Sequence, residues 1–141
     1  MTENWCAHLV GSFKFNVDGV LYGSFGPDGI GGIFRDHPGK IILKFSKSVG
    51  YTNSSSAKLL AIKEAFESFV ESTHVAVVNL VVESDCSNVV SSIGNPISCP
   101  MVFKDLVVNC LKASRGFNWK INLVRREFNC VTDVLAKTEI K

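Results

Sequence analysis

The run VAVVNLVVESD at residues 75–85 most strongly constrains the fold of this chain. Its β-branched residues follow one another almost without a break, which is typical of a strand that other elements cover on both faces. The run is too short to cross a bilayer, and Asn79 interrupts it. Because such a strand needs a layer on each side, the sequence predicts a soluble α/β domain with no membrane partner.

The remaining segments supply the other layers of such a domain. "FKFNVDG" places Phe13, Phe15 and Val17 on one side of a strand, and "IGGIFR", "DHPG" and "KIILKFS" together predict a hairpin. The segments that follow predict a long helix, a strand, two helices, a strand and a last helix, through residues 59–70, 75–85, 86–93, 100–114, 117–124 and 130–137. We therefore expect one domain over residues 1–141 with a mixed sheet.

Composition excludes several classes of protein. The 141 residues are 46% hydrophobic and 20% charged without a low-complexity tract, which predicts a folded chain rather than a disordered one. The five cysteines are widely spaced without a C-x-x-C pair, and we expect no secretory leader. We therefore expect reduced thiols, and an intracellular protein of the cytoplasm or nucleus that is not secreted. A monomer is the expected state.

Charge is unevenly distributed along the chain. Residues 58–103 hold two basic and five acidic side chains, which gives a net charge of −3, whereas residues 104–141 hold eight and four, which gives +4. One interpretation is an acidic pocket beside a basic surface, and the other is a set of unevenly charged solvated faces.

Three aspartates stand where the chain is expected to turn at one edge of the sheet. Asp18 ends the first strand, Asp85 ends the fourth, and Asp133 lies in the first turns of the last helix. In open α/β sheets, ligands gather outside the carboxyl ends of strands, so the three side chains can converge. Clustered carboxylates suit Mg²⁺ or Mn²⁺. The alternative for each is an ordinary turn, cap or solvated helix residue.

Several motifs occur in the order and spacing of one family. They are "KFNVDG", "GIGGIFRDHPGKII", "AKLLAIKEAF", "LVVESD" and "REFNCVTDVLAK". In them the chain resembles, over roughly residues 12–137, the type 1 ribonuclease H-like domains of the plant and retroelement reverse-transcriptase-associated kind. The resemblance implies a five-stranded mixed sheet of order 3-2-1-4-5 with helices on both faces. It also implies an endonuclease that hydrolyses the RNA strand of an RNA–DNA hybrid with two Mg²⁺ or Mn²⁺ ions, held by four acidic residues.

The resemblance assigns site residues one by one. Asp18 matches the first-strand aspartate of the family and Asp85 the fourth-strand aspartate, and Asp133 follows Asn129 at the family's N-x-x-x-D spacing. The fourth acid is a glutamate in the family's A-E-L-L-A element. That position is Lys58 in this chain.

Lys58 alters the chemistry that the resemblance implies. It shares a helical stripe with Ile62, Ala65 and Phe69, so its side chain is expected to point inward, toward the site. An ammonium about 4 Å from a divalent ion would be repelled by up to roughly 8 kcal/mol at an effective dielectric near 20. Lys58 can instead act as an internal counter-ion to the aspartates. We therefore expect hydrolysis to be weak or lost, which leaves three functions open: hybrid nuclease, nucleic-acid-binding protein without hydrolysis, and protein-interaction module.

Binding to nucleic acid has its own candidate residues. A polar cluster precedes the long helix, where it can hold a phosphate, contact a 2′-OH or simply cap the helix. Basic and amide side chains near the end of the chain are further candidates for phosphate contact. The first group is Asn53, Ser54, Ser55 and Ser56, and the second is Lys112, Arg115, Lys120, Arg125, Arg126 and Asn129.

Overall fold

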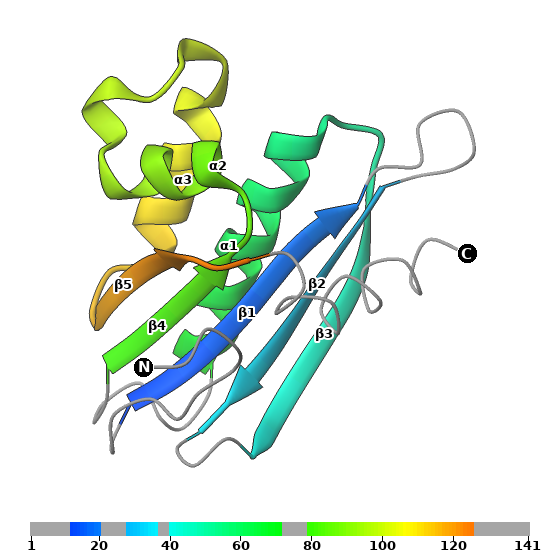
Figure 1. The fold of residues 1–141 in the computed structure, drawn as a ribbon, viewed down its shortest axis with the longest axis vertical. Coiled ribbons are helices and arrows are strands. Elements are labelled where there is room, and N and C mark those ends of the chain that lie inside the picture. Colours follow the sequence, from blue (N-terminus) through cyan, green and yellow to red (C-terminus); the bar gives the residue numbers. More distant parts are fainter. Residues whose placement is uncertain (1–11, 21–27, 37–39, 72–78, 126–141) are drawn as a thin grey trace.

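The computed structural model of the protein describes residues 12–20, 28–36, 40–71 and 79–125. Within these ranges, a five-stranded sheet has the order β3-β2-β1-β4-β5, as predicted (Figure 1). The strands are β1 (Ser12–Val20), β2 (Asp28–Arg35), β3 (Ile41–Gly50), β4 (Asn79–Ser84) and β5 (Asn118–Leu123). The helices are α1 (Ser54–Glu71), α2 (Ser87–Gly94) and α3 (Lys104–Ala113), with 3-10 turns η2 (Pro96–Ser98) and η3 (Met101–Phe103) between the last two.

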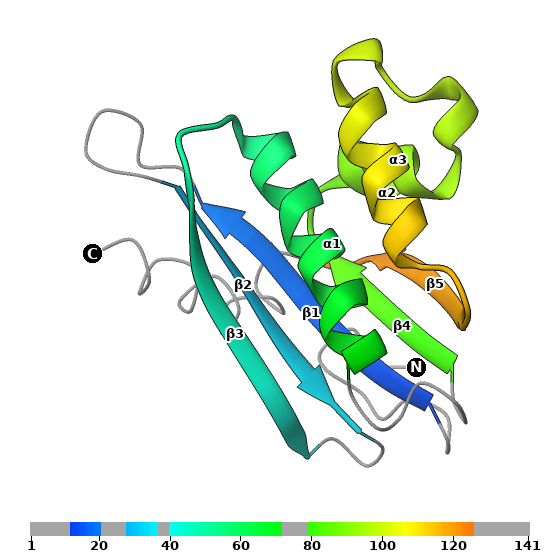
Figure 2. The ribbon, with the colours of Figure 1, turned by 180° about the vertical axis from the view of Figure 1, so that it is seen from behind.

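The sheet is mixed, because β1 pairs antiparallel with β2 and parallel with β4. Strand β5 then adds in parallel to β4, and β3 completes the hairpin with β2. Figure 2 shows α1, with α3 beside it, on the near face of the sheet. The helix predicted at residues 130–137 lies outside the described residues, so helices on both faces remain a prediction. No helix in the described ranges is long and apolar enough to cross a membrane.

The core lies between α1 and the sheet, and aromatic rings form much of it. Phe13, Phe15 and Val17 alternate along β1 as predicted, and all three are buried. Phe34 of β2 stacks on Phe15, with 4.9 Å between ring centroids, and meets Phe69 of α1 edge-on at 5.6 Å. Ring contacts of this kind add about 0.5–1.5 kcal/mol each beyond the area that they bury. They fix α1 against β1 and β2.

Two helix starts differ in their details from simple periodicity. The helix predicted from Pro100 begins only at Lys104, because the Phe103 N–H donates to the Pro100 carbonyl and forms a 3-10 turn first. Helix α1 begins after Asn53, whose Oδ1 accepts the Ser56 N–H at 2.8 Å. Asn53 is thus the helix cap, which was one of its two predicted uses.

The described cysteines, Cys86, Cys99 and Cys110, are free thiols, in agreement with the sequence prediction. Cys110 of α3 is buried against α1, where its thiol donates to the Leu59 carbonyl oxygen at 3.2 Å. Burial raises the pKa of the Cys110 thiol from 9.0 to about 12. We therefore expect roughly a thousandfold less thiolate at pH 8 than an exposed cysteine has.

Cys110 should consequently resist thiol reagents in the native protein at pH 8 and react after unfolding in urea. Alkylation with iodoacetamide followed by peptide mapping measures this, with the half-buried Cys86 as the internal comparison. Labelling of Cys110 as fast as that of Cys86 would contradict the burial.

Candidate functional site

Two aspartates meet at the carboxyl ends of the parallel strands β1 and β4. Asn16 and Glu83 are partners in the register, so Asp18 and Asp85 lie level with each other two residues further along. Parallel strands end at the same edge, and Figure 1 shows both arrows pointing the same way with α1 alongside. The first turns of α1 bring Lys58 to this edge.

Lys58 lies between the two carboxylates. Its Nζ is 3.8 Å from Asp18 Oδ1 and 3.7 Å from Asp85 Oδ1. The side chains are 9%, 2% and 1% exposed, for Lys58, Asp18 and Asp85 in turn. The Gly19 N–H donates to Asp18 Oδ1 at 2.8 Å and orients that carboxylate. We call Asp18, Lys58 and Asp85 the ion triad.

The approach of α1 depends on Gly19. A Cβ atom at this position would lie 2.8 Å from the carbonyl carbon of Ala57 and 2.9 Å from the backbone nitrogen of Lys58. Only a residue without a side chain lets the helix backbone come so close to β1. The glycine therefore sets the distance from which the Lys58 side chain reaches the aspartates.

The ion triad does not fit a pair of divalent ions. Its net charge is −1, from two carboxylates and one ammonium, whereas two such ions bring four positive charges. Among the described residues, no group of three His, Cys, Asp or Glu side chains is placed to hold a metal. Asp133, predicted as a further ligand, lies outside the described residues.

Nearby acids have other partners. Glu83 Oε2 lies 3.1 Å from Lys14 Nζ, and its Oε1 accepts the Asn16 side-chain amide at 2.7 Å. Glu64 points away from the site and pairs with Lys47 at 2.8 Å. Neither acid joins the ion triad.

The cluster around Glu83 escaped the sequence reasoning. Lys14 and Asn16 alternate with core residues in β1, which predicts a solvated side, yet they are only 4% and 2% exposed. Arg35 joins them through Asn16 at 3.5 Å, and its burial lowers its pKa. The signal in the sequence was Glu83 itself, because a charge inside an apolar strand requires a partner.

The predicted nucleic-acid contacts are only partly placed. Asn53 caps α1 and Ser56 is buried, whereas Ser54 is exposed and Ser55 half-buried at the same helix start. The basic side chains of Lys112, Arg115, Lys120 and Arg125 are exposed, from the end of α3 to the end of β5. Arg126 and Asn129 lie outside the described residues.

Comparison with known proteins identifies the family. A family model described as reverse transcriptase-like matches residues 16–139, which is most of the chain. The chain belongs to the reverse transcriptase-like family. A comparison with curated protein sequences finds no match. A plant or retroelement origin remains a prediction.

Solved structures confirm the ribonuclease H fold of this reverse transcriptase-like domain. RNase H1 from the halophilic archaeon Halobacterium salinarum NRC-1 is 20% identical, with a TM-score of 0.82 over 91% of this chain and 96% of the other. LC11-RNase H1, isolated from compost and solved with an RNA/DNA hybrid, is 19% identical, with a TM-score of 0.81 over 91% and 96%. A foamy viral protease-reverse transcriptase, also solved with a hybrid, is 14% identical, with a TM-score of 0.66 over 99% of this chain and 22% of the other.

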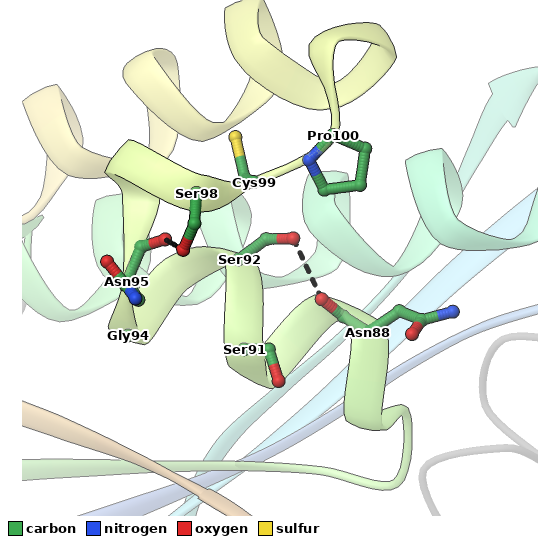
Figure 3. Close-up of a pocket in the computed structure, with 8 residues that line it drawn as sticks. All are labelled: Asn88, Ser91, Ser92, Gly94, Asn95, Ser98, Cys99 and Pro100. Carbon is green, nitrogen blue, oxygen red and sulfur yellow. Dashed lines mark hydrogen bonds between the residues drawn. The ribbon is translucent and has the colours of Figure 1, made fainter.

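One further hollow in this reverse transcriptase-like domain lies between α2 and η2 (Figure 3). Its volume is about 360 Å³, and Asn88, Ser91, Ser92, Asn95 and Ser98 supply amides and hydroxyls to its lining. Residues 86–103, which include this lining, contain no charged side chain at all. The sequence signal for this uncharged lobe was the gap in charge between Asp85 and Lys104, which the sequence reasoning did not use.

Proposed function

We propose that this domain binds RNA–DNA hybrid and hydrolyses it weakly or not at all. Three findings support the proposal: the family, the fold and the hybrids that LC11-RNase H1 and the foamy viral enzyme hold in their solved structures. The observation that carries it is the pairing of Lys58 with both Asp18 and Asp85. The two aspartates that would bind metal in a nuclease of this kind already share a cation.

The placement of polar groups suggests how the backbone of a hybrid is held. The start of α1 offers the exposed Ser54 hydroxyl, the Asn53 side-chain NH₂ and the positive end of the helix dipole, which suit a phosphate or a 2′-OH. The exposed side chains of Lys112, Arg115, Lys120 and Arg125 offer cations for further phosphates. The uncharged lobe offers none.

Hydrolysis by divalent ions would require ligands that the ion triad does not supply. In such chemistry one ion activates water and the other stabilises the leaving oxygen. Here Asp18 and Asp85 hold an ammonium, and no described side chain takes the place of the family's glutamate. The residues that remain can bind and orient a strand without cleaving it.

Fluorescence anisotropy with a labelled hybrid tests the binding. We expect affinity that falls as salt rises and that persists in EDTA, because phosphate contacts and not metal carry it. Replacing Arg115 with alanine should weaken binding and lower the slope of log affinity against log salt by about one. The matched control is Lys44→Ala, which removes an exposed cation from β3, at the opposite edge of the sheet from β5.

Two outcomes would contradict this proposal. Absence of any affinity at low salt would exclude nucleic-acid binding. Loss of binding in EDTA would show that a metal ion, and not the side chains named above, mediates the contact.

The alternative function is that of a protein-interaction module that keeps the fold. The observation that favours it is the uncharged lobe, where Ile97, Met101 and Val102 are 90%, 82% and 74% exposed. Apolar side chains gathered on a surface without charge are typical of protein contacts and not of phosphate contacts. A titration without affinity for hybrid or duplex would support this alternative.

A further inference from the structure

We infer that Lys58 is the resident cation of the ion triad, and that it joins α1 to the ends of β1 and β4 without any divalent ion. The inference goes beyond the proposed function, because it concerns folding and metal binding and requires no nucleic acid. The two can therefore fail separately.

The ion triad buries three charges. All three members of the ion triad are at most 9% exposed, and buried charges are costly unless opposite charges accompany them. The ammonium faces both carboxylates at nearly equal distances, 3.8 and 3.7 Å, so it compensates both. Without it, both buried carboxylates would lose the cation that they share.

The three residues of the ion triad come from three different parts of the fold. Asp18 belongs to β1, Asp85 follows β4, and Lys58 belongs to α1. One cation thus ties together three elements that are distant in the sequence. The distances exceed the 2.7–3.2 Å of a direct hydrogen bond, so the attraction is electrostatic and a divalent ion of similar position could replace it.

A divalent ion would compete with the Lys58 ammonium for the same carboxylates. A divalent ion can enter only if the ammonium leaves, because the two cations would otherwise repel at close range. Leaving means that the Lys58 side chain, only 9% exposed, gives up its buried position and moves its ammonium into solvent. The unmodified protein should therefore not take up a divalent ion at this site, whereas removal of the ammonium should create a site for one.

Thermal unfolding with and without Mn²⁺ tests the inference. We expect the melting temperature of the unmodified protein to be the same in EDTA and in millimolar MnCl₂. Lys58→Gln should melt roughly 5–10 °C lower in EDTA, because it removes the cation that both carboxylates face, and Mn²⁺ should restore most of that loss. Electron paramagnetic resonance should then count one more bound Mn²⁺ in Lys58→Gln than in the unmodified protein.

The matched control is Lys63→Gln on the same helix. Lys63 pairs with Glu67 at 2.9 Å on the surface, where the two side chains are 34% and 45% exposed. Its loss should change the melting temperature by less than about 2 °C, with no response to Mn²⁺.

A saturable stabilisation of the unmodified protein by Mn²⁺, equal to that of Lys58→Gln, would overturn the inference. So would a Lys58→Gln protein that is as stable as the unmodified one in EDTA. If Lys58→Gln folds only with Mn²⁺, the inference is supported in its strongest form. If it does not fold in either condition, the Mn²⁺ titration of the unmodified protein decides, and Asp85→Asn, which keeps the ammonium and one carboxylate, should fold without metal.

Discussion

Replacing Lys58 with glutamate is expected to produce Mn²⁺-dependent cleavage of the RNA strand of a hybrid. The substitution changes the charge of the site by two, from −1 for the ion triad to −3 for three carboxylates, which favours divalent ions. The repulsion that it removes is at most roughly 8 kcal/mol, and each 1.4 kcal/mol of it changes metal occupancy about tenfold. We therefore expect cleavage at least roughly ten times faster than that of the unmodified protein, measured on a hybrid with end-labelled RNA.

Controls separate a restored site from contamination by another nuclease. Adding Asp18→Asn to Lys58→Glu should abolish the gained activity, because it removes a ligand without changing the size of the side chain. Lys58→Gln should gain less than Lys58→Glu, since it removes the positive charge but supplies no carboxylate. Vigorous cleavage by the unmodified protein, equal to that of Lys58→Glu, would show that Lys58 does not disable the site.

Much of the fold could be predicted because local and global signals agree. The β-branched run at residues 75–85 predicted a strand, and within its described part β4 (Asn79–Ser84) lies between β1 and β5. The stripe that Lys58 shares with Ile62, Ala65 and Phe69 predicted an inward-pointing ammonium, and all four residues are buried. Periodicity determines which face of a helix or strand a residue occupies. The resemblance to ribonuclease H-like domains predicted which elements lie against that face.

Other features depend on contacts that periodicity does not report. Lys14 occupies the polar side of β1, yet it is buried, because the sheet face opposite α1 is not simply solvated. Two 3-10 turns precede α3, because Pro96 and Pro100 have no backbone N–H to donate and so start new turns. The helical spacing of apolar residues continues through these turns and does not reveal them. The structure brings Asp18 and Asp85 together around Lys58, and their role in binding metal stays a prediction.

Gly19 is the second position where a single change should have a large effect. Replacing it with alanine places a Cβ atom 2.8 Å from two atoms of Ala57, one of them in the backbone, and 2.9 Å from the Lys58 nitrogen. Because backbone atoms cannot rotate away as a long side chain can, the start of α1 must move off β1. We expect the free energy of unfolding to fall by about 1–3 kcal/mol, measured by urea denaturation.

The matched control for Gly19→Ala is Gly94→Ala at the end of α2, where an added Cβ meets nothing within 4 Å. That change should leave the free energy of unfolding within about 1 kcal/mol of the unmodified value. Equal stability of the two variants would show that α1 does not need close contact with β1.

A double-mutant cycle tests whether Gly19 supports the ion triad. If Gly19→Ala moves α1, it lengthens the ion pairs of Lys58. Lys58→Gln should then lower the free energy of unfolding less in the Gly19→Ala protein than in the unmodified protein. Full additivity would mean that the ion triad holds its geometry independently of Gly19.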